Sequence, residues 1–282
     1  MTNLLGASEI RELANKLDLK PTKKLGQNFV VDANTCRKIV KLAEVGNKDI
    51  ALEIGPGLGS LTLALLESAK QVVAVEIDDR LAKQLPLTSS EHGFSDKQLI
   101  TLNQDAMVLQ KLSVKPNVLV ANLPYNISVP VLLNTLEHFP SITRGVVMVQ
   151  SEVAHRLAAK PDNKDYGSPT VKANWWSSLH LAGSVGRSVF WPVPNVDSSL
   201  VRFDRHAPLG SESERIATFA VIDEAFAKRR KMMRSALGQL FGGKAEEYLN
   251  NAGVDPTIRG EALSVEQFYE IGKQLIKHNR TK

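Results

Sequence analysis

The segment IALEIGPGLG, residues Ile50–Gly59, decides the fold of this chain. An apolar run of strand length passes through a turn with three glycines and leads into a helical pattern at Leu58–Ala69. Glycines at a strand-to-helix turn let the backbone pass close to a ligand, because they have no Cβ to collide with it. The segment therefore predicts the first strand, the ligand-binding loop and the first helix of an α/β domain.

Further apolar runs of strand length follow, with little polar alternation: Val72–Ile77, Leu99–Leu102, Val118–Ala121 and Val146–Val149. Such runs are typical of strands buried on both faces. Helical patterns occur at Ser128–His138, where Ser128 is suited to an N-cap, and at Ser151–Ala159. Strands that alternate with helices predict a parallel, doubly wound sheet. Two later runs, Leu179–Val185 and Ser198–Phe203, extend this sheet, and their short connection favours an antiparallel ending.

The pattern changes near His206. From Ser211 onward only helices are indicated, separated by Gly242-Gly243, Gly253 and Pro256: Glu214–Lys228, Lys231–Phe241, Ala245–Ala252 and Ser264–Lys277. We therefore expect two domains, an α/β domain at residues 1–207 and a small all-helical domain at residues 208–282.

Composition narrows the class of protein. The 282 residues carry a net charge of +5, which favours a polyanionic partner. With Cys36 as the single cysteine, no disulfide can form within the chain, which fits a reducing cytoplasm. Met1–Leu19 does not resemble a signal peptide, and no apolar run reaches the ~18 residues of a membrane span. The six histidines lack metal-ligand spacing, so we expect no metal and a cytoplasmic protein.

The glycine turn also indicates the class of cofactor. A dinucleotide fingerprint would need glycine at position 60, where this chain has Ser60. An acid two residues before the first glycine, here Glu53 before Gly55, is typical of S-adenosylmethionine methyltransferases. Glu76, 21 residues beyond Gly55, is placed to accept hydrogen bonds from ribose hydroxyls. Asp105, which follows the next strand, is suited to accept one from the cofactor's adenine amino group.

The tetrad Asn122-Leu123-Pro124-Tyr125 follows the fourth strand, at the carboxyl edge where ligands bind in such sheets. An amine on an aromatic ring is a poor nucleophile, because its lone pair is delocalised. The Asn122 side-chain oxygen and the Leu123 carbonyl can bind its two hydrogens and expose the lone pair to a methyl donor. Pro124 stiffens the turn, and Tyr125 offers a ring on which a flipped base can stack. The tetrad predicts methyl transfer to an exocyclic amine, achieved mainly by orientation.

Together these segments resemble the ribosomal RNA adenine dimethyltransferases. The similarity runs from Leu25 to Phe268 and rests on five segments: Gly26–Val30, Glu53–Gly59, Asn122–Ser128, Phe190–Ser199 and Phe226–Lys231. It implies a Rossmann-like methyltransferase fold and S-adenosyl-L-methionine as the cofactor. It also implies cofactor contacts at Asn28, Val30, Gly55, Glu76, Asp105 and Asn122. Leucine is more usual than valine at position 30.

The resemblance is strongest to the bacterial enzymes of this family that act on the small ribosomal subunit. It implies dimethylation of N6 of two adjacent adenosines in a hairpin loop near the 3′ end of 16S rRNA, late in subunit assembly. The catalytic residues are then Asn122, Leu123, Pro124 and Tyr125, with Phe190 as a second aromatic residue at the target base. We expect a monomer that binds 16S rRNA in the small subunit or its precursor.

Basic residues gather in two places. Lys20, Lys23 and Lys24 precede the cofactor segment, and five more fall within seven positions of the helical domain: Lys228, Arg229, Arg230, Lys231 and Arg234. The run is interpreted as part of an amphipathic helix, and such runs are often only a solvated helix face. The resemblance implies RNA contact, so Lys23, Lys24 and the five clustered residues are the candidate RNA-binding side chains. The pair Trp175-Trp176 is expected to serve packing rather than base stacking.

Three alternatives remain open from the sequence. One is an antibiotic-resistance methyltransferase that acts on large-subunit rRNA. Another is a ribosome-assembly factor whose binding and release matter more than catalysis. The third is a nicotinamide dehydrogenase, which Ser60 and Glu53 disfavour.

Overall fold

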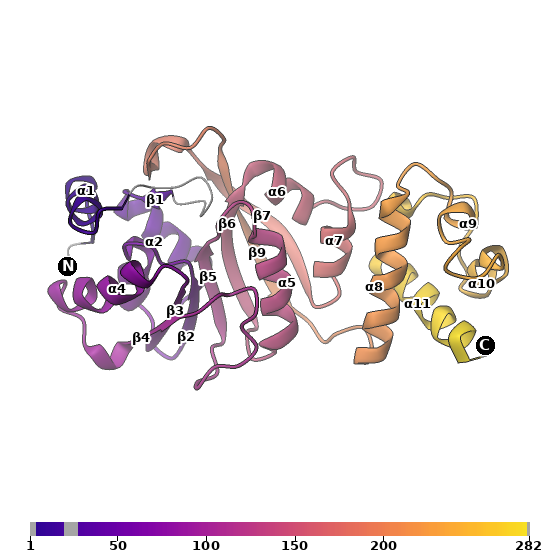
Figure 1. The fold of residues 1–282 in the computed structure, drawn as a ribbon, viewed down its shortest axis with the longest axis horizontal. Helices are drawn as coiled ribbons and strands as arrows, with labels where there is room; N and C mark the ends of the chain where they lie inside the picture. The colour runs from indigo at the N-terminus through magenta and orange to yellow at the C-terminus, as the bar shows by residue number, and fades with distance from the viewer. Residues whose placement is uncertain (1–3, 20–27, 281–282) are drawn as a thin grey trace. The chain divides into compact units, whose positions relative to one another are not determined.

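The computed structural model describes residues 4–19 and 28–280. Its central element is a seven-stranded sheet (Figure 1). The strands lie in the order β4 (Leu99–Asn103), β3 (Gln71–Glu76), β2 (Ile50–Ile54), β5 (Val118–Asn122), β6 (Arg144–Gln150), β9 (Ser198–Arg205) and β7 (Ser177–Val185). All seven sequence-predicted strands are therefore present, with ends that differ by at most two residues.

The sheet is parallel through its first five strands, from β4 to β6. Strand β9 is antiparallel to β6, with Arg144 opposite Asp204 and Gln150 opposite Ser198. The predicted doubly wound sheet is confirmed, and so is an antiparallel strand near its end. The strand order reverses at β2, which has β3 on one side and β5 on the other. Ligands bind at such a switch point, which here places the turn after β2 beside the tetrad that begins at Asn122.

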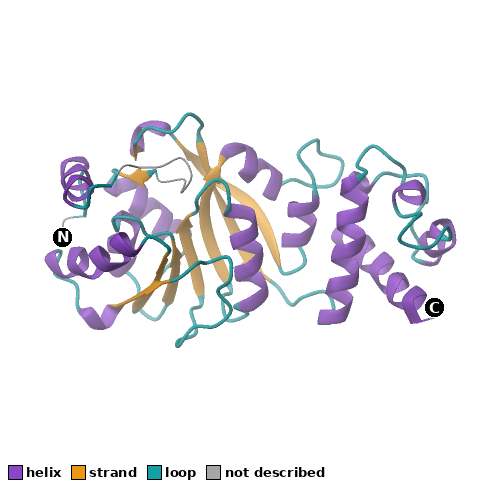
Figure 2. Ribbon diagram, viewed as in Figure 1, coloured by secondary structure: helices purple, strands orange, loops and turns teal. Residues whose placement is uncertain are grey.

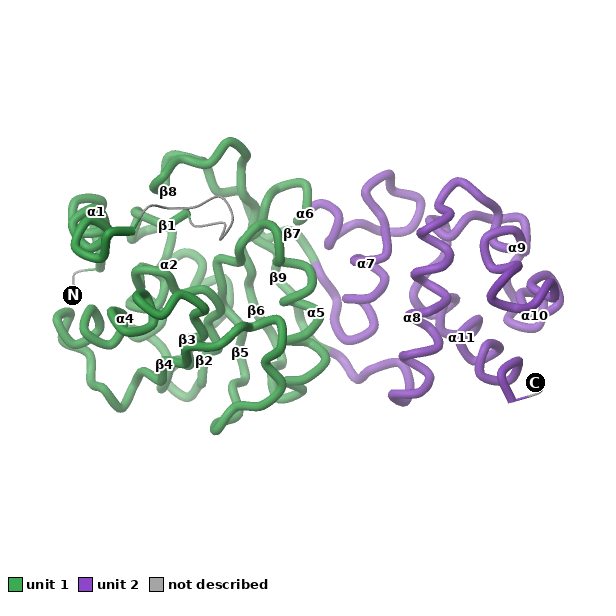
Figure 3. Tube along the Cα trace, viewed as in Figure 1, with its two compact units in different colours: residues 1–154, 180–205 green, residues 155–179, 206–282 purple. Residues whose placement is uncertain are grey.

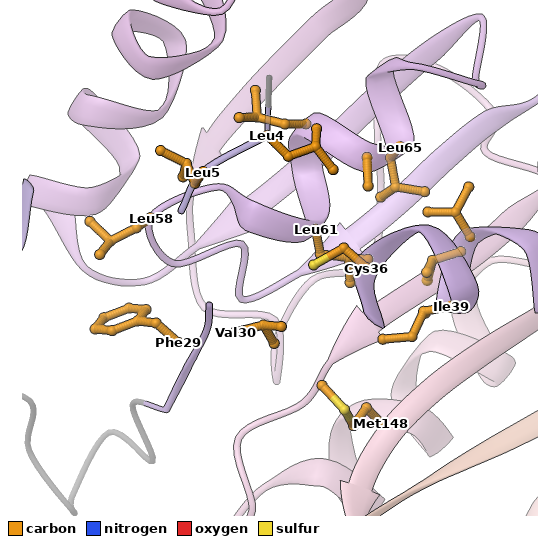
Figure 4. Packing of buried hydrophobic residues seen from close by; sticks show 14 of the residues in the cluster. Leu4, Leu5, Phe29, Val30, Cys36, Ile39, Leu58, Leu61, Leu65 and Met148 are labelled. Atoms are coloured by element: carbon orange, nitrogen blue, oxygen red, sulfur yellow. The ribbon is translucent and has the colours of Figure 1, made fainter. Parts of the chain in front are cut away.

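Helices flank the sheet on both faces (Figure 2). The helices of the α/β part are α1 (Ala7–Lys16), α2 (Ala33–Leu42), α3 (Ser60–Leu66), α4 (Asp79–Glu91) and α5 (Ser128–His138). Alternate strand residues point to opposite faces. Val118 and Val120 accordingly belong to the apolar cluster formed with α1, α2 and α3, whereas the equally buried Leu119 does not. In Figure 4, side chains of α2, α3 and β6, among them Ile39, Leu65 and Met148, gather in that cluster.

A second, two-stranded sheet lies in the same cluster. Strand β1 (Phe29–Val30) pairs antiparallel with β8 (Phe190–Trp191), with Phe29 opposite Trp191 and Val30 opposite Phe190. Neither strand was predicted from the sequence, because a two-residue strand has no measurable periodicity. Helices α1 and α4 were not predicted either. The helix α5 has its predicted bounds, but the residue at its N-cap is Ile127, so the predicted cap at Ser128 was wrong.

The chain separates into two compact units (Figure 3). The first contains residues 1–154 and 180–205, and the second contains residues 155–179 and 206–282. The last crossing between them follows Arg205, two residues before the expected boundary, but residues 155–179 cluster with the C-terminal helices rather than with the sheet. Helices of the second unit are the end of α6 (Ser151–Leu157), α7 (Ser168–Ala173), α8 (Glu212–Ala227), α9 (Met233–Ala236), α10 (Ala245–Asn251) and α11 (Val265–Arg280). Short 3₁₀ turns lie at Asp96–Gln98, Arg187–Val189 and Gly260–Ala262.

The two adjacent tryptophans explain why residues 155–179 belong to the second unit. Trp175 and Trp176 are buried, and each packs edge-on against Phe219 of α8. Trp175 makes a second edge contact with Tyr269 of α11. The sequence-based expectation that this pair serves packing is confirmed.

The predicted helix Lys231–Phe241 is wrong. Helix α9 contains only Met233–Ala236, and turns continue to Gly243. The reason is tertiary: the Met233 and Arg234 amides donate to the carbonyls of Ile258 and Pro256 instead of to a preceding helical turn. The basic residues Lys228–Lys231 therefore lie in a turn after α8 and not on a helix face. Among the described helices, none is long and apolar enough to cross a membrane.

Candidate active site

A cavity lies at the carboxyl ends of β2, β3, β4 and β5. It contains about 870 Å³ of space, part of it open to solvent. All six residues predicted to contact the cofactor line it: Asn28, Val30, Gly55, Glu76, Asp105 and Asn122. The structure thus brings together side chains that are up to 94 positions apart, the separation of Asn28 and Asn122.

The glycine turn forms one wall of the cavity. Gly55, Gly57 and Gly59 all have positive φ, which side chains with a Cβ rarely adopt. A Cβ on Gly57 would also lie 2.9 Å from the Phe29 ring, so the ring of β1 closes directly over the turn. Figure 4 shows Phe29 beside Leu58, the next residue of this turn. The positive φ values and the close Phe29 ring explain the need for glycine without reference to a ligand.

Glu76 ends β3 and faces the cavity. One carboxylate oxygen accepts the Gly57 amide at 3.1 Å, and the other accepts the Asp78 amide at 3.0 Å. Burial raises the pKa of Glu76, and the hydrogen bonds from these amides partly offset that effect. Each oxygen retains acceptor capacity, so the carboxylate can hold ligand hydroxyls while it fixes the glycine turn.

Asp105 follows β4 by two residues and also lines the cavity. Its Oδ1 accepts the Met107 amide at 2.8 Å, which holds the side chain in place. The Gln104 amide donates to the Glu76 carbonyl at 3.1 Å and ties this loop to β3. Ile77, whose side chain is more than half exposed, also lines the cavity and supplies an apolar surface for a flat ring.

Glu53 is the most deeply buried acid of the site. It lines the cavity, and its Oε2 accepts the Thr62 hydroxyl at 2.6 Å. Burial raises the pKa of Glu53 to about 8, the Thr62 bond lowers it, and the nearby Glu76 charge raises it further. The side chain is therefore mostly protonated at pH 7 in the ligand-free protein.

Glu53 should make the stability of the ligand-free protein depend on pH. The folded pKa of about 8 lies above the ordinary value of 4.5, so the folded state binds the proton more tightly. This contribution to stability is complete below about pH 4.5 and is lost as the pH rises towards 8. The isosteric Glu53→Gln variant does not titrate, so its Tm relative to wild type should rise by several degrees between pH 5 and pH 8. Parallel Tm curves for the two proteins, measured by calorimetry, would contradict this assignment.

Asn122, the first residue of the tetrad, lines the same cavity as the glycine turn. Asn122 ends β5, and its Nδ2 donates to the Asn28 carbonyl at 3.1 Å. The Leu123 amide donates to Met148 of β6 at 3.0 Å, which fixes the turn. A Cβ placed on Gly55 would lie 3.7 Å from the Pro124 ring, so the tetrad and the glycine turn are in contact range. The Asn28 carbonyl occupies the donor Nδ2, and Oδ1, the one acceptor of this amide, remains for another donor.

Not all predicted catalytic residues reach the cavity. Leu123, Tyr125 and Phe190 are not among the residues that line it. Tyr125 is half-buried directly after the lining residue Pro124, whereas Phe190 is 2% exposed and belongs to the apolar cluster. The neighbouring Trp191 is half-buried and stacks on Phe29, with ring centroids 6.3 Å apart. Adjacent strand residues face opposite sides, so β8 directs Trp191 towards Phe29 and Phe190 into the core.

The predicted RNA-binding residues fall in different environments. Lys20, Lys23 and Lys24 lie outside the described residues. In the second unit, Lys228 pairs with Glu224, and Arg234 lies 3.8 Å from Glu246.

Within the turn after α8, the basic residues differ in how they are used. Arg229 pairs with Glu261 at 2.9 Å and also donates to the Lys164 carbonyl, so it holds three segments together. Arg230 and Lys231 are exposed and have no acidic partner within residues 4–19 and 28–280. These two side chains are the ones available to a phosphate. The same ranges contain no cluster of histidine, cysteine and acidic side chains suited to hold a metal ion.

The comparisons with known proteins agree with this geometry. Residues 19–277 match the model of the family described as ribosomal RNA adenine dimethylase. The chain belongs to the ribosomal RNA adenine dimethylase family. It is 54% identical over 275 residues to ribosomal RNA small subunit methyltransferase A of Streptomyces griseus, covering 96% of this chain and 94% of that protein. The protein of the same name from Corynebacterium diphtheriae is 53% identical over 280 residues, covering 96% and 95%.

Solved structures show the same architecture. A dimethyladenosine transferase from Plasmodium falciparum superimposes with a TM-score of 0.75 at 22% identity, covering 89% of this chain and 98% of that one. The 23S rRNA methyltransferase ErmE gives a TM-score of 0.65 at 28% identity, covering 88% and 100%. The predicted Rossmann-like methyltransferase fold is confirmed. As a member of this family the protein is an rRNA adenine dimethyltransferase, which excludes the nicotinamide dehydrogenase.

Proposed function

We propose that this protein transfers methyl groups from S-adenosyl-L-methionine to N6 of two adjacent adenosines in a hairpin loop near the 3′ end of 16S rRNA. The substrate is the small ribosomal subunit or its precursor, late in assembly, and the enzyme acts as a monomer in the cytoplasm. Identity above 50% to proteins named for the small subunit supports this substrate over 23S rRNA, on which the 28% identical ErmE is named to act.

The observation that supports the chemistry best is the hydrogen bond from Asn122 Nδ2 to the Asn28 carbonyl. With Nδ2 bound to a backbone carbonyl, the amide is held in place and Oδ1 remains available to accept a hydrogen bond from the adenine amine. An adenine amine has two hydrogens, and the Leu123 carbonyl provides the second acceptor one residue further along. With both hydrogens bound, the nitrogen lone pair is directed away from the acceptors. No base is needed before transfer, because the amine is neutral at pH 7.

The cavity fits the proposed cofactor in its chemistry. Glu76 provides a buried carboxylate for ribose hydroxyls, and Asp105 with Ile77 provides an acceptor and an apolar surface for adenine. When bound, S-adenosylmethionine supplies an electrophilic methyl group. The Gly55 turn allows it to approach the tetrad, because Gly55 has no side chain between them.

The two aromatic residues proposed to contact the target base, Tyr125 and Phe190, lie in different environments. Tyr125 is half-buried at the end of the tetrad, and its ring is suited to stack on a base flipped out of the RNA. Phe190 lies in the apolar core, so its proposed role requires the β8 segment to rearrange when the substrate binds.

Methyl transfer to defined substrates tests the proposal. Small ribosomal subunits that lack the modification should accept tritiated methyl groups, and mapping should place them on N6 of two adjacent adenosines near the 3′ end of 16S rRNA. Large-subunit rRNA should remain unlabelled. Labelling of 23S rRNA alone would instead indicate a methyltransferase that acts on large-subunit rRNA. Binding to the small subunit without labelling would favour a role purely in ribosome assembly.

We further propose that Arg230 and Lys231 contact rRNA phosphates. Replacing both with glutamine should weaken binding to the small subunit and flatten its salt dependence by about 1.5 in the slope of log K against log salt. Cofactor affinity should not change. The matched control is Lys48→Gln with Lys70→Gln, which removes two exposed charges at the amino edge of the sheet, before β2 and β3. Equal salt slopes for both double variants, measured by filter binding, would show that Arg230 and Lys231 do not contact rRNA phosphates.

A further inference from the structure

The Tyr125 hydroxyl has a specific anchor. Its Oη lies 2.8 Å from Oγ of Ser198, the first residue of β9, which is fully buried. Burial raises the pKa of Tyr125, and the bond to Ser198 partly offsets this effect. The sequence alone predicted no functional role for Ser198. A buried hydroxyl is retained at little cost only when it is hydrogen-bonded, and the Tyr125 phenol is its partner here.

Ser198 is rigidly held. It lies opposite Gln150 at the end of β6. The carbonyl of the preceding residue, Asp197, accepts the Ser151 amide at 3.0 Å, and the following residue, Ser199, lies opposite Val149 of β6. Backbone contacts on both sides of Ser198 thus hold it against β6 and against Ser151, the first residue of α6.

Strand β6 also holds the catalytic tetrad on its other edge. Asn122 lies opposite Met148, whose carbonyl accepts the Leu123 amide. Tyr125 itself is in a turn between β5 and α5, where no ladder fixes the direction of its ring. The bond to Ser198 therefore holds the ring to β9. Strand β9 pairs with β6, the strand that positions Asn122 and Leu123.

We propose that Ser198 is a positioning residue for methyl transfer: by holding the Tyr125 hydroxyl, it sets the plane on which the target adenine stacks. The adenine amine then lies between the Asn122 and Leu123 acceptors. Small displacements of a reacting group reduce rates strongly, so fixing this plane affects turnover more than binding. The inference rests on the proposed function, because it needs the tetrad to be the catalytic centre.

The test compares Ser198→Ala, Tyr125→Phe and the double variant in single-turnover methylation of small subunits. Each single variant removes the same hydrogen bond and should slow methylation about three- to tenfold, with unchanged cofactor affinity. The double variant should be no slower than either single one, because the two residues act as a unit. The matched control is Ser199→Ala, which deletes the neighbouring buried hydroxyl that contacts Ser151 instead, and it should remain near wild type.

A second readout is independent of activity. Tyrosines labelled with ¹³C at Cζ report their phenol pKa by NMR, and Tyr125→Phe identifies the signal among the four tyrosines. Ser198→Ala should raise the Tyr125 pKa, because it removes a bond that lowers it. Additive rate losses, an unchanged pKa, or an equal loss in Ser199→Ala would overturn the inference. If the proposed function itself fails, wild-type protein will not methylate the small subunit at all, whereas the pKa shift will persist. Should Ser198→Ala not fold, Tyr125→Phe tests the same bond from its more exposed side.

Discussion

Asn122→Ala protein will bind the small ribosomal subunit as wild type does and will methylate it more slowly by on the order of a hundredfold, about 2.7 kcal/mol. The substitution removes one of the two acceptors that orient the adenine amine. An interaction that matters chiefly in the transition state lowers the turnover rate more than it changes substrate binding. Because Asn122 also lines the cofactor cavity, the rate must be measured at saturating S-adenosylmethionine in single-turnover experiments.

Asn122→Asp separates the acceptor from its orientation. It retains an acceptor oxygen but loses the Nδ2 donor to the Asn28 carbonyl, and it places a negative charge beside that carbonyl. We expect a loss of about tenfold, smaller than in Asn122→Ala. A well-folded Asn122→Ala protein with near-normal rates would remove Asn122 from the catalytic centre. Equal rates for Asn122→Asp and wild type would show that the Asn28 bond is not needed.

Glu76→Ala should weaken S-adenosylmethionine binding ten- to a hundredfold, about 1.5–3 kcal/mol, while the protein remains folded. The carboxylate is nearly buried and is the expected acceptor for two ribose hydroxyls. It also accepts the Gly57 amide, so its loss loosens the glycine turn as well. Both effects act on the cofactor, and isothermal titration calorimetry measures their sum.

Asp79→Ala is the matched control for Glu76→Ala. It deletes an acid close in sequence, but the Asp79 side chain is mostly exposed, pairs with Lys83 and does not line the cavity. Its cofactor affinity should match that of wild type. Equal affinities for Glu76→Ala and wild type would exclude Glu76 from the cofactor site.

Much of the fold could be predicted from local sequence. Strands β2, β3, β5 and β6 are buried on both faces and therefore appear as apolar runs, and α5 has the bounds that its pattern predicts. Helix α9 could not be predicted, because the Met233 and Arg234 amides bond to residues more than twenty positions away. The basic run was consequently assigned to a helix although it lies in a turn. Sequence spacing likewise could not show that residues 155–179 pack with α8 and α11 through Trp175.

The candidate site, like the fold, was predicted from the sequence only in part. The sequence by itself determined that Gly55, Glu76, Asp105 and Asn122 meet at the cavity, since each ends or follows a parallel strand and the carboxyl ends of such strands share one edge. Only the tertiary structure decided how those residues are oriented. The Asn28 carbonyl turns the Asn122 amide, Ser198 holds the Tyr125 hydroxyl, and the pairing of β1 with β8 buries Phe190 while it stacks Trp191 on Phe29. These contacts join positions between 73 and 162 residues apart, 29 to 191 being the longest, and no local pattern records them.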